Sequence, residues 1–384
     1  MTVFSRKGGS IVLIEKKDTD YSFGMISDEI LYIILEQYGF EDEWIVLPFI
    51  DINRNAIAIN KRSETARKAV VLYRNDLYIV KEVPWYVSNE SFTRFEMAYQ
   101  DQVRQQGSKV PKLLRAKDGK LYVSIQSGNK KIYIFIQEYV VGGSWDGSIR
   151  CIKSAAATLA ELHNHSLKIA NEIIQEYNPP AANVYQLARK MLDILLEDLN
   201  EKEKLNTVND VKIIQKFHDV CIQKCIVMEI EAMKLGYDKL KIPVHGDYNP
   251  WNIVTDEQQK ELLGVIDFDN AIVDNPIHDV VEAVLDFCYM KYRDQTTRFS
   301  EIPTFFNTSY AVCFLSSYQK NIEFNFNQVL PYIKSAATVV AIELFSLGII
   351  RGDYRPQDCP LLLKQIEYIG DYIEEVLEQM EWSI

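Results

Sequence analysis

Apolar residues in the first 140 positions fall in short runs with the spacing of β-strands. The runs are WIVLPFI (44–50), AVVLY (69–73), LYIVKEV (77–83), LYVSIQ (121–126) and KIYIFIQEYVV (131–141). Only Arg74-Asn75-Asp76 separates the second run from the third, and this short polar segment predicts a turn. We therefore expect residues 69–83 to form an antiparallel hairpin.

Helical spacing appears twice in the same part of the chain, over 27–38 and 90–106. In the second segment, Phe92, Phe95, Tyr99 and Val103 share one predicted face. After Gly147 the pattern becomes mainly helical, over 148–165, 183–200, 207–235 and most of 277–384. Short Val/Ile-rich pieces at 242–245, 252–254 and 262–268 interrupt it.

The order of these elements predicts an α+β fold of two lobes. Residues 1–140 would form a small N-terminal lobe with an antiparallel sheet, an extra N-terminal segment and a helix. Residues 141–384 would form a larger, mainly helical lobe that holds the interrupted segment. A two-lobe plan predicts a ligand-binding cleft between the lobes.

Composition narrows the classes of partner. The chain has 54 acidic and 42 basic residues, a net charge of −12, which disfavours nucleic acids and anionic membranes. The apolar run near the N-terminus is too short for a signal peptide, and no run of 18 apolar residues occurs. We expect a cytoplasmic protein without a membrane partner, as a monomer or homodimer.

The interrupted segment carries the strongest motif. It reads IPVHGDYNPWNIV (242–254) and LLGVIDFDNAIVDNPIHD (262–279). Asp247 is followed by Asn252 and then by an apolar strand that ends in Asp267. Carboxylate and amide oxygens are the hard ligands that Mg²⁺ prefers. The four residues His245, Gly246, Asp247 and Asn252 at these fixed offsets, followed by such a strand, are improbable by chance. The spacing therefore indicates a functional site.

This pattern resembles the family of aminoglycoside phosphotransferases, choline kinases and related small-molecule kinases, which have a bilobal protein-kinase-like fold. The resemblance implies ATP or GTP as phosphate donor and Mg²⁺ as the metal. It implies that Asp247 accepts the proton of the acceptor hydroxyl and that Asn252 and Asp267 bind the metal.

The resemblance also implies supporting residues around this motif. His245 would hold the catalytic loop by packing and hydrogen bonding. Asp279 would cap and brace the same loop. Asp269 stands where protein kinases have the glycine of Asp-Phe-Gly, and it would support a second metal ion or the acceptor.

The nucleotide side of the site is implied by the predicted hairpin. Lys81 lies where the family places the lysine that binds the α- and β-phosphates. Its carboxylate partner would be Glu96, midway along the 90–106 helix, with Glu90 as the alternative. Adenine would bind the backbone of the segment that contains Glu138 and Val140.

Two spacings favour a small substrate over a protein. The glycine-rich loop GxGxxG of protein kinases is absent, and residues 51–55 read DINRN. Only eleven residues separate Asp267 from Asp279, which leaves no room for a peptide-binding activation segment. Gly246 stands where regulated protein kinases carry the arginine that binds the phosphate of the activation loop.

We therefore expect phosphorylation of a hydroxyl on a small molecule, with an amine-bearing acceptor such as an aminoglycoside, amino sugar or amino alcohol. Acids after Gln365, with Asp269, Asp274 and Glu282, would make a negative acceptor cleft; alternatively, the C-terminal acids only solvate an amphipathic helix. Arg351 and Arg355 could instead bind a carboxylate. The alternatives are a kinase for homoserine- or methylthioribose-like acceptors, and a kinase-fold binding or structural protein of the spore-coat type.

Overall fold

The structure is a computed structural model that describes 4–7, 10–13, 26–40, 44–47, 67–84, 89–127, 130–179, 182–201, 208–258, 260–290 and 302–381. It divides into two compact units. Unit 1 comprises Met1–Ser144, Asn171–Pro179 and Ile253–Asp269, and unit 2 comprises Trp145–Ala170, Pro180–Asn252 and Asn270–Ile384. The lobe boundary expected after residue 140 stays a prediction.

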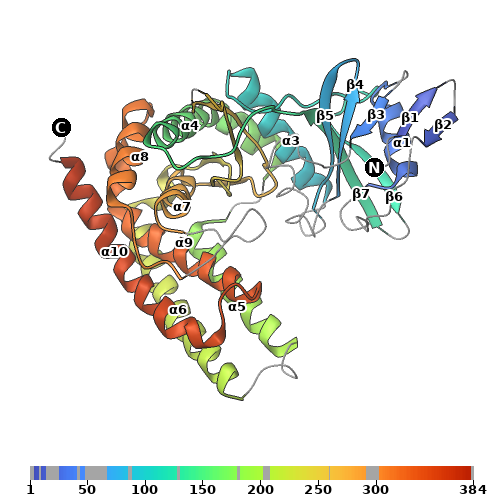
Figure 1. Cartoon of the computed structure of the whole chain (residues 1–384). Coiled ribbons are helices and arrows are strands. Elements are labelled where there is room, and N and C mark those ends of the chain that lie inside the picture. The colour runs from blue at the N-terminus through green and yellow to red at the C-terminus, as the bar shows by residue number, and fades with distance from the viewer. Residues whose placement is uncertain are drawn as a thin grey trace. The chain divides into compact units, whose positions relative to one another are not determined.

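Unit 1 contains a seven-stranded antiparallel sheet (Figure 1). In spatial order its strands are β2 (Ser10–Leu13), β1 (Phe4–Lys7), β3 (Trp44–Leu47), β4 (Lys68–Tyr73), β5 (Asp76–Glu82), β7 (Lys130–Glu138) and β6 (Val123–Ser127). The predicted hairpin is confirmed as β4–β5, with Tyr73 paired to Asp76. The loop is the two residues Arg74 and Asn75, both with positive φ, the conformation of tight hairpin turns.

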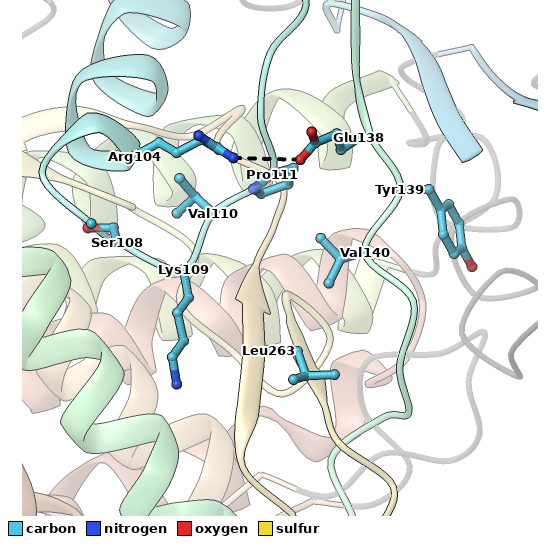
Figure 2. Close-up of a pocket in the computed structure, with 10 residues that line it drawn as sticks. Arg104, Ser108, Lys109, Val110, Pro111, Glu138, Tyr139, Val140 and Leu263 are labelled. Carbon is cyan, nitrogen blue, oxygen red and sulfur yellow. Dashed lines mark ion pairs between the residues drawn. The ribbon is translucent and has the colours of Figure 1, made fainter. Parts of the chain in front are cut away.

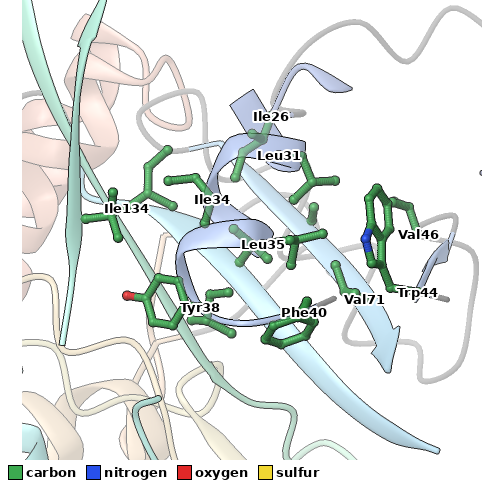
Figure 3. Packing of buried hydrophobic residues seen from close by; sticks show 14 of the residues in the cluster. Ile26, Leu31, Ile34, Leu35, Tyr38, Phe40, Trp44, Val46, Val71 and Ile134 are labelled. Carbon is green, nitrogen blue, oxygen red and sulfur yellow. The ribbon is translucent and has the colours of Figure 1, made fainter. Parts of the chain in front are cut away.

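Helix α1 (Asp28–Gln37) covers one face of this sheet (Figure 3). Leu31, Ile34 and Leu35 of this helix are almost fully buried, and they pack with strand residues such as Val71 and Ile134. The spacing of these helix residues places them on one side of the helix, so burial of that side holds the helix on the sheet.

Helix α3 (Glu90–Gln105) packs with the other face. Its Met97 joins a second cluster with Val83, Tyr133 and Phe135, which alternate along their strands with residues of the α1 cluster. The predicted apolar face of this helix is confirmed, because Phe92, Phe95, Tyr99 and Val103 are all buried. Lys81 follows Val80 of the α1 cluster, so its side chain points to the α3 side.

Unit 2 is mainly helical. Its helices include α4 (Ile149–Tyr177), α5 (Val184–Glu201), α6 (Val208–Leu235), α7 (Ile277–Cys288), α8 (Thr308–Asn321), α9 (Leu330–Ile350) and α10 (Cys359–Glu381). Helix α9 is long and apolar enough to span a membrane, but 72% of its apolar stretch is buried, where it contacts α5, α6, α7 and α10. It is therefore a core helix of unit 2.

Two short two-stranded sheets flank the motif residues. Strand β8 (Ile242–Val244) pairs with β11 (Ile272–Asp274) in unit 2, and β9 (Ile253–Thr255) pairs with β10 (Leu262–Val265) in unit 1. The turn after β8 carries residues 245–252, and the turn after β10 carries residues 266–271. An antiparallel sheet with helices in one unit and a mainly helical second unit confirm the expected α+β class.

Candidate active site

The loop after β8 fixes the side chain of Asp247. Asn249 donates its Nδ2 to Oδ1 of Asp247 over 2.6 Å, and Asn252 donates its Nδ2 to Oδ2 over 2.9 Å. The backbone N–H of Asp247 donates to Nδ1 of the buried His245 over 3.3 Å. Each carboxylate oxygen of Asp247 thus accepts a hydrogen bond from an asparagine amide, and these two bonds orient the carboxylate.

Asp279, at the start of α7, ties this loop to the helices of unit 2. Its carboxylate accepts the backbone N–H groups of His245 and Gly246, each over 2.8 Å. His163 on α4 lies 2.9 Å from the same carboxylate through Nε2, and its Nδ1 lies 2.7 Å from the hydroxyl of Tyr318 on α8. Burial raises the pKa of Asp279, but the hydrogen bond to His163 and the electrostatic effect of His163, His278 and His245 outweigh it and lower this pKa to about 2.

A second group of site residues surrounds Lys81 in unit 1. The Lys81 ammonium binds one oxygen of Asp267 and one oxygen of Asp269. Only 4% of its side chain is exposed, and the Phe135 ring lies 5.7 Å below the ammonium. Lys68, the first residue of β4, approaches the other oxygen of Asp267 at 3.6 Å. Two lysines therefore share the carboxylate that follows β10.

These contacts set the charges of the group. Burial raises the pKa of Asp267, but the ammoniums of Lys68 and Lys81 outweigh it and hold this pKa well below its ordinary value. Burial lowers the pKa of Lys81, but Asp267 and Asp269 outweigh it and hold this pKa above its ordinary value. For Asp269, burial and the charge of Asp267 prevail over Lys81 and raise its pKa to about 6.

Phe268 anchors the segment between the two acids. Its ring is buried and meets Tyr99 of α3 edge-on, with centroids 5.5 Å apart. Asp267 itself has a φ of +71°, a left-handed conformation that is uncommon for residues other than glycine, asparagine and aspartate. The aromatic anchor and this backbone conformation direct both carboxylates toward Lys81.

The two candidate partners of Lys81 have different surroundings. Glu96 is buried in α3, close to Asp269 and to the charge of Lys81. Burial and Asp269 raise the pKa of Glu96 well above its ordinary value. Glu90 is half-exposed at the start of α3, where it binds Lys131 at 2.9 Å and accepts the Tyr122 hydroxyl over 3.2 Å. Its contacts lead away from Lys81, so the geometry favours Glu96.

The segment after β7 lines a pocket of about 460 Å³ in unit 1 (Figure 2). Glu138, Tyr139 and Val140 form part of its wall, together with Leu263 and residues at and after the end of α3. The N–H groups of Glu138 and Tyr139 donate to Lys112 and Leu77. Within the described residues, the N–H of Val140 has no such acceptor, so it is a donor that a bound ligand could use.

Three residues of these groups were not identified from the sequence. Lys68 was missed because its position opposite Lys81 depends on strand register, and Asn249 because asparagine in such a loop is common. His163 was missed because its contact with Asp279 joins residues 116 positions apart in the sequence. An asparagine two residues after Asp247 was the one available signal, since Asx side chains commonly bond backbone and side-chain groups nearby.

Comparison with known proteins extends the motif-based resemblance. The model of the phosphotransferase enzyme family matches residues 70–298. This match spans more than half of the chain and contains both groups of site residues, apart from Lys68. No curated protein sequence matches the chain.

Solved structures of several kinases have the same fold. An amicoumacin kinase in complex with AMP-PNP and Ca²⁺ has a TM-score of 0.55 and 14% identity over 79% of this chain and 85% of that chain. A Plasmodium vivax ethanolamine kinase has a TM-score of 0.54 and 13% identity over 92% of this chain and 96% of that chain. An aminoglycoside phosphotransferase from Alicyclobacillus acidocaldarius has a TM-score of 0.53 and 12% identity over 82% of this chain and 90% of that chain. The expected protein-kinase-like fold is confirmed.

Proposed function

Because the chain belongs to the phosphotransferase enzyme family, we propose that it transfers the γ-phosphoryl group of ATP to a hydroxyl of a small molecule, with Mg²⁺ as cofactor. The observation that carries this proposal is the buried arrangement of Lys81 on Asp267 and Asp269. A buried ammonium needs anionic partners, and phosphate oxygens can replace carboxylates in that role.

Asp247 is the proposed general base. It would accept the proton of the acceptor hydroxyl while that oxygen forms its bond to the γ-phosphorus and the bond to the β-phosphate oxygen breaks, which leaves ADP. Phosphoryl transfer depends mainly on positioning and charge neutralisation. The hydrogen bonds from Asn249 and Asn252 to Asp247 supply that positioning.

The residues present fit Mg²⁺. Asp267 has a lowered pKa and is ionised at neutral pH, and Asn252 directs its Nδ2 toward Asp247, which leaves its amide oxygen for a cation. Both are hard oxygen donors of the kind that Mg²⁺ prefers. When bound, Mg²⁺ would neutralise the charge of the β- and γ-phosphates. His245 and Asp279 would hold the loop that carries Asp247 and Asn252.

The adenine-binding segment would be residues 138–140. The available N–H of Val140 supports a hydrogen bond to adenine, and Glu138 would contribute backbone contacts beside it. Backbone groups select the base only weakly, so GTP is a second donor to be compared with ATP. Lys81 would bind the α- and β-phosphates, and Glu96 would help to orient Lys81.

For the acceptor, we propose an amine-bearing hydroxyl compound, such as an amino sugar or amino alcohol. Support comes from the net charge of −12, which attracts cations at long range. The detailed acidic cleft expected from the sequence is wrong for Asp274, and Glu282 is also buried, where it accepts the backbone N–H of Tyr248 over 3.2 Å. Asp274 is fully buried and bonds Tyr237 at 3.0 Å and His278 at 3.2 Å, so it is unavailable to a ligand.

The acids of α10 also support the simpler of the two readings. Its inward residues Ile366, Ile369, Ile373 and Val376 are buried. The acids Glu367, Asp371, Glu374, Glu375 and Glu378 are exposed, and Glu374 pairs with Lys334. These acids are those of a solvated amphipathic helix. The proposed preference for amines therefore rests on the overall charge of the chain.

The deciding experiment is ATP turnover by the purified protein with Mg²⁺. The acceptor panel would contain amino sugars, amino alcohols, homoserine, methylthioribose and hydroxy acids, each at low and high salt. We expect turnover with amines and a KM that rises with salt, because salt screens the attraction. Turnover confined to anionic acceptors would contradict the acceptor class. MgATP binding without turnover of any acceptor would favour the kinase-fold binding protein instead.

A further inference from the structure

Lys68 is a second buried lysine beside Lys81. Residue 68 pairs directly with residue 81 in the antiparallel register of β4 and β5, and directly opposed residues point to the same face of a sheet. The exposed fraction is 9% for the Lys68 side chain and 4% for that of Lys81. Two ammonium groups are thus brought together on the face of the sheet that α3 covers.

This pair is unfavourable unless an anion lies near it. Like charges directly opposite each other destabilise a sheet, and a buried ammonium without a partner is costly. Asp267 meets this need, with one oxygen on Lys81 and the other 3.6 Å from Lys68. Asp269 adds a contact to Lys81, whereas among the described residues Asp267 is the carboxylate that forms an ion pair with Lys68.

We infer that Lys68 binds a terminal phosphate oxygen of the nucleotide, next to Lys81. This inference rests on the proposed function, in which Asp267 binds Mg²⁺. When the Asp267 carboxylate binds a cation, it interacts less strongly with Lys68 and Lys81. The β- and γ-phosphates of the nucleotide are the anions that would replace it beside these lysines. Charge-assisted hydrogen bonds to phosphate are strong enough for this exchange.

The sequence gives an independent reason to expect a phosphate-binding side chain at Lys68. Glycine-rich loops bind phosphates through backbone N–H groups, but residues 41–106 of this chain contain no glycine. A lysine at the first position of β4 would provide by charge the contact that such a loop provides through its backbone.

Nucleotide binding by variants of the full chain tests this role. Lys68→Gln removes the charge and keeps a side chain of similar reach, while Lys81 still binds Asp267 and Asp269. Arg67→Gln is the matched control, because Arg67 is the adjacent cation, points to the other face and pairs with Glu82. Lys68→Met repeats the measurement if Lys68→Gln fails to fold.

Calorimetric titration with ATP, ADP and AMP, each with Mg²⁺, separates the phosphates. We expect Lys68→Gln to raise the Kd for ATP by about 10-fold to 100-fold, the worth of a hydrogen bond to a charged group, and to leave the Kd for AMP within about 2-fold. Arg67→Gln should leave the Kd values for ATP, ADP and AMP unchanged. An unchanged Kd for ATP, or equal losses for ATP and AMP, would overturn the inference. Wild-type protein that binds none of the three would instead overturn the proposed function on which it rests.

Discussion

Asn252 donates its side-chain amide to the carboxylate of Asp247, with Nδ2 2.9 Å from Oδ2. The same nitrogen also lies 2.8 Å from the carbonyl oxygen of Asp247, so two contacts fix the orientation of the amide. A proposed metal ligand therefore positions the proposed base directly. Any change in the orientation of the Asn252 amide would therefore alter its hydrogen bond to the Asp247 carboxylate.

Asp247→Asn should keep the fold and lower turnover by about 10²-fold to 10⁴-fold, the usual contribution of a positioned general base. The amide keeps the shape of the side chain but cannot accept the proton. Steady-state kinetics with the best acceptor of the panel, together with MgATP binding by calorimetry, would measure this. Asp238→Asn, which removes an exposed acid paired with Lys241 in unit 2, is the control and should be silent. Wild-type turnover by Asp247→Asn would refute the assignment of the base.

Asp267→Asn should abolish the Mg²⁺-dependent part of the thermal stabilisation by ATP. Asparagine tolerates the positive φ of this position, so the substitution removes charge with little backbone strain. A ligand that binds the folded state stabilises it by mass action, so the shift in Tm with ATP should be the same with Mg²⁺ and with EDTA. A shift that still requires Mg²⁺ in this variant would show that Asp267 is not a ligand.

Much of this site could be predicted because its residues are close in sequence. Asp247 and Asn252 lie on one loop, and Asp267 follows β10, so one short stretch of sequence carries the pattern that resembles small-molecule kinases. The β4–β5 hairpin could also be predicted, because a polar turn between two apolar runs fixes the pairing locally.

The remaining residues depend on contacts that are distant in sequence. The position of Lys68 beside Asp267 requires the register of β4 against β5 and the fold of a segment almost 200 residues later. His163 of α4 and Asp279 of α7 are 116 residues apart in the sequence, so their contact depends on the tertiary fold of unit 2. Asp274 was assigned to an acidic acceptor cleft because its sequence neighbours do not reveal its burial and its bonds to Tyr237 and His278.

Glu96→Gln should lower kcat/KM for ATP modestly and should change the pH dependence of stability. The raised pKa of Glu96 means that the folded state keeps a proton that the unfolded chain releases, so this group lowers stability as pH rises above its ordinary value of 4.5. Glutamine has no such proton, and urea unfolding at several pH values should show a flatter profile. Glu90→Gln is the matched comparison. If Glu90→Gln reproduced the kinetic defect and Glu96→Gln did not, Glu90 would be the partner of Lys81.

His278→Gln should destabilise the protein at pH 6 more than at pH 9. Burial lowers the pKa of His278, but its bond to Asp274, aided by the charges of Asp279 and Glu282, outweighs burial and raises this pKa to about 9. Stability from a raised histidine pKa is fully present below the ordinary value of 6.5 and is lost as pH rises through about 9. We expect a difference on the order of 2–3 kcal/mol between these limits. His218→Gln is the control, and an equal loss at both pH values would contradict the charged pair.

Gly246→Ala should cost more stability than the same change at Gly352, although both glycines have nearly the same backbone conformation. Their φ values are +73° and +75°, so alanine meets similar strain at each, about 1 kcal/mol. A Cβ at residue 352 would have no neighbour within 4 Å, whereas a Cβ at residue 246 would lie 2.1 Å from the carbonyl oxygen of Asn270. That contact is with backbone and cannot be relieved by a side-chain rotation, so the loop carrying Asp247 or the turn after β10 must move. We expect Gly246→Ala to lose roughly 3 kcal/mol or more in urea unfolding, with a fall in kcat of at least about 10-fold, because small displacements of catalytic groups are costly. Gly352→Ala should keep wild-type kcat. Equal stability losses and normal turnover in both variants would mean that the close approach of Gly246 to Asn270 does not hold the catalytic loop.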